Sequence, residues 1–341
     1  MKAGTSLVSG LEAAPALAAA AVRNALARAG LDQAAGVVLF LSGEFSRHPQ
    51  PAVLAAARQA GCLQVFGMVA NGLFTESGWS LDQPAAAALV VGDGAALRLP
   101  VGEAGTRMAL AGTATLPAEW QQGPLRHGLV NAGAGVWQHS RLAESARCEA
   151  EFTGVRCAAA LSTGLQLLGD EQVVDAVHAY DVARIGGLSA QDSLRRALPP
   201  HLRERSELPL HRVSAVAADG RPIPFLAANA DGSLTFALPV AAGEPIRWAL
   251  RQPLAAEIDM RTSLEPLAAA CPNPEFALVF SCIGRGPLFY GNDDLDLLAC
   301  RQRFPGLPLL GAYGSGQIVA REGRNCQYQN SVVTLLFAPS P

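Results

Sequence analysis

The stretch Val38-Leu-Phe-Leu-Ser42 is an unbroken apolar run that ends in a serine, and Ala277-Leu-Val-Phe-Ser281 repeats its pattern near the other end of the chain. Apolar runs of this length without alternation are typical of strands that are buried on both faces. Each run is followed by a loop with an arginine, a helix-like segment and a second apolar strand, Leu63 to Gly67 or Leu307 to Gly311. The alternation of strands and helices predicts an α/β fold.

The parallel between the two ends of the chain continues beyond these strands. Three further pairs of segments match in order: Ala70-Asn-Gly72 with Gly314-Ser-Gly316, Glu76-Ser-Gly78 with Arg321-Glu-Gly323, and the apolar runs 86–91 with 332–337. The second copy needs about five extra residues, which we place in the loop from Gly284 to Asn292. We therefore expect two related, pseudo-duplicated α/β units whose sheets and helices form layers, each unit covering the sheet of the other.

Composition divides the chain into three parts. Residues 1–125 form the first α/β unit, 126–250 a strand-rich middle block, and 251–341 the second α/β unit. The first unit is expected to contain helices over 11–29, ending at Gly30, and over 51–60. In the middle block a helix is expected over 190–198, with Ser189 as its N-cap. Residues 101–125 contain several Gly and Pro residues and are interpreted as a linker or irregular segment.

The overall composition excludes several classes of protein. Half of the residues are apolar and 16% are charged, but no apolar stretch reaches the roughly 20 residues that span a bilayer. The formal net charge of −3, with no block of like charges, argues against a nucleic-acid partner. The seven cysteines contain no Cys-x-x-Cys pair, which favours reduced thiols in the cytoplasm.

The C-terminal motifs resemble a known family. Phe280-Ser-Cys-Ile-Gly-Arg-Gly286, Pro308-Leu-Leu-Gly-Ala-Tyr-Gly-Ser-Gly316 and Asn330 with the strand after it are similar to the C-terminal half of FIST (F-box and intracellular signal transduction) proteins. Ile185-Gly-Gly-Leu-Ser-Ala190 resembles the family's glycine-containing turn, and the N-terminal block is similar to the FIST N half. Where many members have Gly-Glu-Ile, this chain has Gly316-Gln-Ile318.

The resemblance implies a cytoplasmic sensory module that binds a small molecule such as an amino acid. FIST proteins are often coupled to kinases, cyclases or chemotaxis receptors, so we expect a separate signalling partner such as a histidine kinase or a cyclase. Some members are haem proteins that respond to nitric oxide. Haem is therefore an alternative cofactor, although the sequence assigns no ligand to its iron.

The predicted ligand site lies on two loops near the C-terminal strands. Arg285 stands between two glycines directly after a buried strand, where ligands gather in α/β sheets, and a guanidinium can bind an anion with two donors. Tyr313, with Gly314, Ser315, Gly316 and Gln317 after it, follows the next strand. These residues and Cys282 predict a site for a small anion. An equally weighted interpretation is that Arg285 holds its own loop by binding carbonyl groups.

Three other interpretations concern single residues. Noncovalent haem needs one axial imidazole, and His178, in an apolar strand candidate, is expected to be the buried histidine. Cys282 could be an enzyme nucleophile, but no histidine lies near it in sequence. Asn292-Asp-Asp294 resembles a fragment of a cation loop and is better explained as a helix N-cap. The sequence thus favours a sensor over an enzyme.

Overall fold

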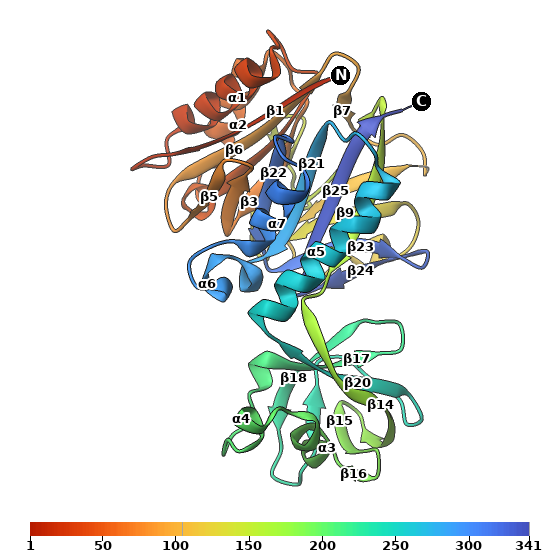
Figure 1. The fold of residues 1–341 in the computed structure, drawn as a ribbon. Helices are drawn as coiled ribbons and strands as arrows, with labels where there is room; N and C mark the ends of the chain where they lie inside the picture. The colour runs from red at the N-terminus through yellow and green to blue at the C-terminus, as the bar shows by residue number, and fades with distance from the viewer. Residues whose placement is uncertain (104, 341) are drawn as a thin grey trace. The chain divides into compact units, whose positions relative to one another are not determined.

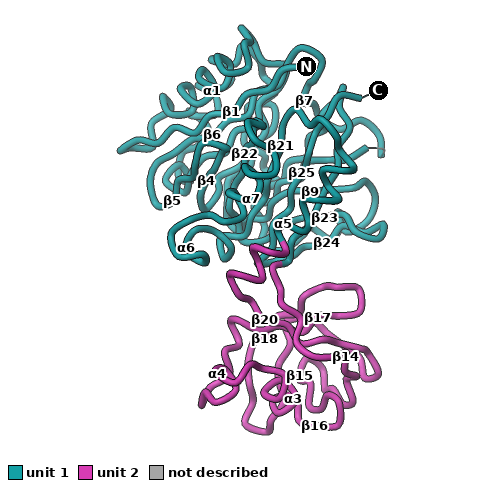
Figure 2. Tube along the Cα trace, viewed as in Figure 1, with its two compact units in different colours: residues 1–163, 260–341 teal, residues 164–259 magenta. Residues whose placement is uncertain are grey.

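The computed structural model describes residues 1–103 and 105–340, which divide into two compact units (Figure 2). Unit 1 contains residues 1–163 and 260–341, and unit 2 contains residues 164–259. Unit 2 therefore interrupts the sequence of unit 1. The predicted three-part division, with boundaries after residues 125 and 250, remains a prediction, and these compact units follow other boundaries.

Unit 1 is built from three six-stranded sheets (Figure 1). Sheet 1 has the order β1 (Lys2–Ser9), β6 (Ala85–Gly92), β2 (Gly36–Ser42), β3 (Val65–Ala70), β10 (Val136–Gln138) and β11 (Arg141–Leu142). Sheet 2 has the order β7 (Ala96–Arg98), β12 (Arg147–Thr153), β8 (Thr106–Ala111), β9 (Leu125–Val130), β23 (Gly316–Arg321) and β24 (Arg324–Tyr328). Sheet 3 has the order β13 (Val155–Ser162), β25 (Val332–Pro339), β21 (Phe276–Cys282), β22 (Leu309–Gly314), β4 (Gly72–Thr75) and β5 (Gly78–Leu81).

The three sheets share one pattern of pairing. In each, the third and fourth strands are parallel (β2 with β3, β8 with β9, β21 with β22) and the other neighbours are antiparallel. Each sheet takes its first four strands from one part of the chain. We call these parts repeat 1 (β1–β6), repeat 2 (β7–β12) and repeat 3 (β13 and β21–β25). The α/β class is confirmed, and the shared pattern links three segments of the chain rather than the two that the sequence indicated.

Each repeat donates a hairpin to another repeat's sheet. Hairpin β4–β5 of repeat 1 pairs with β22 in sheet 3, β10–β11 of repeat 2 pairs with β3 in sheet 1, and β23–β24 of repeat 3 pairs with β9 in sheet 2. The exchange closes a ring of three. Because every sheet is completed by a neighbour, the edge next to its fourth strand is covered within the same chain.

One glycine in each sheet makes room for this exchange. Gly67, Gly128 and Gly311 occupy the same register of the fourth strand, opposite Trp137, Ile318 and Phe74 of the donated hairpins. A Cβ atom on Gly311 would lie 2.0 Å from the Phe74 ring, and one on Gly67 would lie 1.7 Å from the Leu39 carbonyl oxygen. The strands therefore approach each other more closely than a side chain would permit.

Helices cover the sheets of repeats 1 and 3. Repeat 1 contains α1 (Pro15–Ala29) and α2 (Gln50–Ala60), whose buried alanine and valine faces pack against β1, β2, β3 and β6. Repeat 3 contains α5 (Pro253–Ala270), α6 (Pro287–Tyr290) and α7 (Leu295–Arg303), and short 3-10 turns follow the third strands as η1 (Gly43–Phe45) and η4 (Ile283–Arg285). The predicted cap at Gly30 is confirmed, since this residue ends α1 in the left-handed conformation.

Repeat 2 departs from this plan. In its described residues, 96–103 and 105–153, the connections hold one 3-10 turn, η2 (Ala118–Trp120), and no α-helix. Arg126 covers part of this face: its guanidinium binds Glu149 Oε1 at 2.7 Å and lies over the Trp120 ring. Residues 101–125 are thus only partly irregular, because strand β8 lies among them and is buried next to β9.

Unit 2 is an antiparallel β-barrel. Its strands follow the order β14 (Leu165–His178), β20 (Pro245–Arg251), β17 (Val213–Ala217), β18 (Pro222–Ala228), β19 (Leu234–Phe236), β15 (Asp181–Ile185) and β16 (Leu188–Ser189). An additional pairing of β14 with β15 closes the barrel. Outside the strands lie α3 (Ala190–Ala197), α4 (Pro200–Arg203) and η3 (Leu210–Arg212). Its core is separate and contains Trp248, Phe236 and Phe225.

Two predictions about unit 2 have different outcomes. Ser189 caps α3 as predicted, because its hydroxyl accepts a hydrogen bond from Asp192 N. The prediction that His178 is buried is wrong: it is exposed at the end of β14, a strand in which most residues are exposed or half-buried.

Candidate functional site

Arg285, the centre of the predicted site, is almost completely buried and fully occupied within the protein. Its exposed fraction is 1%. Nε and Nη2 donate to the two carboxylate oxygens of Asp296, at 3.1 and 2.6 Å, while Nη1 donates to the carbonyl and hydroxyl oxygens of Ser162 at 3.2 and 3.1 Å. Nη2 also lies 3.3 Å from the Tyr290 hydroxyl. The guanidinium therefore ties α7 and β13 to the loop after β21.

Electrostatics keeps this arginine charged. Burial alone would lower the pKa of Arg285, but the Asp296 carboxylate outweighs burial and raises the pKa above its usual range. A buried charge is tolerated when its partner is equally buried and well hydrogen-bonded, and Asp296 is 2% exposed. The contact matches the second interpretation of Arg285, in which the side chain holds its own surroundings together.

Tyr313 lies beside this pair and is also buried. Its hydroxyl donates to Asp294 Oδ2, and its ring packs 4.7 Å from that of Phe74 in the exchanged hairpin. Asp294 also caps α7, since its Oδ1 accepts from Leu297 N at 2.9 Å, so the N-cap interpretation of this residue is confirmed. Burial, together with the nearby Asp296, raises the pKa of Asp294 to about 6.

The residues after Tyr313 carry the chain from sheet 3 to sheet 2. Ser315 N and Oγ both donate to the Val130 carbonyl, at 2.9 and 3.1 Å. Gly314 lies so close to Leu129 that a Cβ atom would come within 2.7 Å of its side chain, and Gly316 pairs with Val130. Gln317 is buried and its Oε1 accepts from Ser331 Oγ at 2.9 Å. All four thus support the exchange of hairpin β23–β24.

Cys282 is buried at the end of β21. Its Sγ lies 4.0 Å from Asn330 Oδ1, a contact that supplies no base for the thiol. The structure therefore brings Arg285 and Tyr313 onto two acids at the start of α7, Asp296 and Asp294, whereas Cys282, Ser315 and Gln317 make their contacts elsewhere. Sequence reasoning identified Asp294 only as a cap and did not identify Asp296. A ligand role for these residues remains a prediction.

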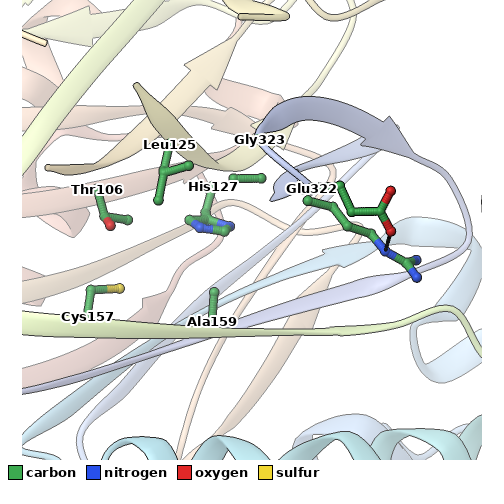
Figure 3. A pocket seen from close by; sticks show the side chains of 9 residues that line it. Thr106, Leu125, His127, Cys157, Ala159, Glu322 and Gly323 are labelled. Atoms are coloured by element: carbon green, nitrogen blue, oxygen red, sulfur yellow. Dashed lines mark ion pairs between the residues drawn. The ribbon is translucent and has the colours of Figure 1, made fainter. Parts of the chain in front are cut away.

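A cavity of about 370 Å³ lies elsewhere in unit 1, between β9, β13 and the tip of hairpin β23–β24. Figure 3 shows Thr106, Leu125 and His127 on one side, facing Cys157 and Ala159 on β13. The remaining lining residues belong to the hairpin tip: Ala320, Arg321, Glu322 and Gly323. None of the predicted site residues lines this cavity.

The imidazole and the thiol that line the cavity are uncharged at neutral pH. Burial lowers the pKa of His127 to about 4, and it raises the pKa of Cys157 to about 12. His127 is 5% exposed, and its Nδ1 has no hydrogen-bond partner among the described residues. Arg321 and Glu322 form an ion pair with each other at 3.8 Å, which is drawn dashed in Figure 3. The cavity thus combines an apolar wall with a neutral imidazole.

His127 was missed because strand β9 has no marked apolar pattern. It lies directly before Gly128, as Phe66 precedes Gly67 and Leu310 precedes Gly311, and that spacing is the signal that locates it. Among the described residues, no group of three or more histidine, cysteine or acidic side chains could hold a metal ion.

Comparison with known proteins connects the chain to one domain family. Residues 190–320 match the model of the FIST C domain. The uncharacterized protein Rv0628c of Mycobacterium tuberculosis is 24% identical over 197 residues, and the uncharacterized protein Mb0898c of Mycobacterium bovis is 25% identical over 197 residues. In both cases the alignment covers 54% of this chain and 51% of the relative. The chain thus spans about half the length of the curated relatives it matches.

The described helices were also compared with what a membrane requires. No helix over residues 1–103 and 105–340 combines the length and the hydrophobicity that crossing a bilayer takes.

Proposed function

Because this chain belongs to the FIST family, through the C-domain match over residues 190–320, we propose that it is a signal-transduction sensor that binds a small molecule. The observation that carries the ligand-binding part is the cavity of about 370 Å³ in unit 1. Ligand pockets in proteins measure roughly 300–1,000 Å³, so this cavity is large enough for a molecule of amino-acid size.

A binding experiment tests the proposal. A panel of amino acids, organic acids and neutral amides is titrated against the protein by calorimetry, and the melting temperature is measured with each compound. At least one compound is expected to bind and to raise the melting temperature, because a ligand that binds only the folded state stabilises it. Ala159→Leu, which places a larger side chain in the cavity, should abolish the effect.

The matched control is Ala242→Leu, at an exposed alanine in unit 2. It should bind as the wild type does. If no compound binds, or if Ala159→Leu binds undiminished, the cavity is not the sensory site.

An anionic ligand at Arg285 was the prediction from sequence, and it is kept here as part of the proposal. An anion would have to compete with Asp296 and Ser162, which already bind the guanidinium. A carboxylate that binds wild type and Ala159→Leu equally would support Arg285 as its partner. Coupling to a separate histidine kinase or cyclase, and a cytoplasmic location, also belong to this proposal.

A haem-based nitric oxide sensor is the second candidate, and His127 is the observation that favours it. A neutral imidazole in an apolar pocket can bind haem iron, and His127 lines the cavity in that state. Reconstitution with haem should give a Soret band that shifts with nitric oxide in wild type and in the exposed-histidine control His178→Ala, but not in His127→Ala. Absence of a band at stoichiometric haem removes this candidate.

A further inference from the structure

The cavity is one of three equivalent places in the ring of repeats. At each, the tip of a donated hairpin lies beside the residue that precedes the fourth-strand glycine. The strand register shows which residues are equivalent. On the three donated hairpins, the residues opposite the fourth-strand glycines are Phe74, Trp137 and Ile318. The residues two positions later in each hairpin are therefore equivalent as well, and these are Glu76, His139 and Ala320. What occupies the first two places indicates what the third can hold.

In the first place, the protein fills the space with a carboxylate. Glu76 Oε2 accepts from Thr5 Oγ1 at 2.5 Å and from Leu309 N at 3.0 Å. Its other oxygen lies 3.3 Å from Arg28 Nη1, which supplies the opposite charge. A hydroxyl, an amide and a guanidinium thus surround this carboxylate.

In the second place, the protein fills the space with a ring. The imidazole of His139 packs edge-on against the Phe66 ring, with 5.4 Å between ring centroids and 85° between planes. Phe66 is the residue before the fourth-strand glycine, and it is completely buried. Two planar rings therefore close the space.

In the third place, the filling side chains are reduced to alanine. Ala320 stands where Glu76 and His139 stand. Ala159 is equivalent to Thr5 by the register of the sheets. Thr5 pairs with Leu89, which pairs with Val38 of the third strand. In the same way, Ala159 pairs with Leu335, which pairs with Leu278 of the third strand. The residue before the glycine is His127, a planar ring like Phe66. The cavity is what these two alanines leave open.

We propose that this cavity binds a small uncharged ring compound, such as a heteroaromatic, which packs against His127 as His139 packs against Phe66. The inference rests on the proposed function, that the cavity binds a small molecule, and adds the chemical class. Edge-to-face packing of rings contributes about 0.5–1.5 kcal/mol beyond the area that is buried.

The charges around the cavity favour an uncharged occupant. The imidazole, the Cys157 thiol and the Thr106 hydroxyl are neutral, and the charged lining residues, Arg321 and Glu322, pair with each other. A carboxylate placed beside His127 would have to compete with Glu322 for Arg321, the cation among the lining residues, whereas Glu76 already has Arg28. Burying a charge without a partner is costly, whereas a neutral ring can hydrogen-bond with the imidazole at little cost.

The test compares ring compounds that differ in charge. Benzimidazole, indole and benzamide are titrated against the wild type by calorimetry, with benzoate as the charged match of benzamide and acetate as a carboxylate without a ring. Benzamide is expected to bind at least about tenfold more tightly than benzoate at pH 7.5. Benzoate that binds as tightly as benzamide, or acetate that binds alone, overturns the inference while the proposed function stands; if no compound of any class binds, the proposed function fails too.

Two variants test the class by filling the cavity with a side chain of the protein. Ala320→His reproduces the ring of the second place and Ala320→Glu the carboxylate of the first. Ala320→His is expected to have the higher melting temperature and to lose benzamide binding by more than about tenfold, and Ala242→His is the exposed control. A more stable Ala320→Glu, or unchanged binding in Ala320→His, contradicts the proposal. In labelled protein, bound benzamide should shift the His127 ring resonances and leave those of His178 unchanged.

Discussion

Arg285 and Asp296 illustrate how a residue's role depends on its partner. A surface arginine between two glycines could bind an incoming anion, but this one meets a carboxylate that is already inside the protein. The two charges lose water together, and the hydrogen bonds of the pair compensate for that loss. Removal of either charge would leave the other buried and unpaired.

The first prediction follows from this pair. Arg285→Ala should lower the free energy of unfolding by about 3–5 kcal/mol, because it leaves the Asp296 carboxylate buried without its partner. Urea unfolding followed by circular dichroism measures the change. Arg301→Ala, at an exposed position of the same helix α7, should change stability by less than about 0.5 kcal/mol. Equal effects would show that the pair does not stabilise the fold.

The second prediction concerns pH and His127. The pKa of this histidine is about 4 in the folded protein, below its ordinary value of 6.5, so the unfolded chain binds more protons between these two values. The contribution of His127 therefore makes the protein more stable as pH rises from about 4 to about 6.5. The free energy of unfolding of His127→Phe, minus that of the wild type, should therefore be larger at pH 5 than at pH 7.

Thermal unfolding at pH 5 and pH 7 measures this difference, and His178→Phe is the exposed control, which should show none. Asp294 acts in the opposite direction, because its pKa is raised to about 6 and its contribution weakens as pH rises from about 4 to 6. Identical pH profiles for wild type and His127→Phe would contradict the assignment of a buried, neutral imidazole.

At the scale of elements, close approaches between strands explain the glycines of the fourth strands, to the exchanged hairpin at Gly311 and to the third strand of the same sheet at Gly67 and Gly128. A strand can accept a large side chain from a neighbouring hairpin only if its own residue at that register has no side chain. Gly67 faces Trp137 in this way, and its α-carbon also lies against the Leu39 carbonyl of the adjacent strand. The close approach is a property of two elements, since neither strand requires glycine alone.

The third prediction is that Gly67→Ala destabilises the protein more than Gly311→Ala. A methyl group on Gly67 would lie 1.7 Å from a backbone oxygen, whereas on Gly311 it meets the end of the Phe74 side chain, which can move. Forcing atoms into a packed core typically costs about 1–3 kcal/mol, and a backbone clash belongs at the upper end. Chemical unfolding of both variants measures the order.

Gly43→Ala is the control, since nothing lies within 4 Å of its added methyl group and the residue is exposed. It should unfold as the wild type does. A Gly67→Ala variant of undiminished stability would show that β2 and β3 can separate, and the account of their close approach would then be wrong.

At the scale of the whole molecule, unit 2 follows β13 in the sequence and ends at residue 259, within α5 of repeat 3. In repeat 1, the equivalent strand β1 and helix α1 are joined by residues 10–14 alone. Unit 2 has its own barrel and its own core, so the fold of unit 1 does not depend on its residues for a sheet or for a core cluster.

The fourth prediction is that unit 1 folds without the barrel. Replacement of residues 164–252 by a five-residue Gly-Ser linker should leave a protein with cooperative thermal unfolding, because both connections that the linker joins remain within repeat 3. Nitrogen–proton correlation spectra should retain the unit 1 resonances of the full chain. Loss of cooperative unfolding would show that unit 1 needs the barrel.

Local chemistry alone determined several features of this protein. The apolar runs at 38–42 and 277–281 predicted the buried strands β2 and β21, and Gly30, Ser189 and Asp294 predicted where helices begin or end, because caps depend on residues within one turn. The α/β class follows from the same local patterns. His178 and residues 101–125 were misread, because β14 is mostly exposed despite its apolar residues, and β8 is a buried strand within a segment that contains several Gly and Pro residues.

Tertiary structure alone decided which residues come into contact. The third repeat, the exchanged hairpins and the burial of Arg285 each depend on contacts between residues that lie far apart in sequence, such as Gly67 with Trp137 and Ser162 with Arg285. The cavity beside His127 exists because Ala159 and Ala320, which look ordinary in sequence, are brought together by two different sheets. A cavity forms where small side chains come together, and the order of residues along the chain does not show which residues will surround it.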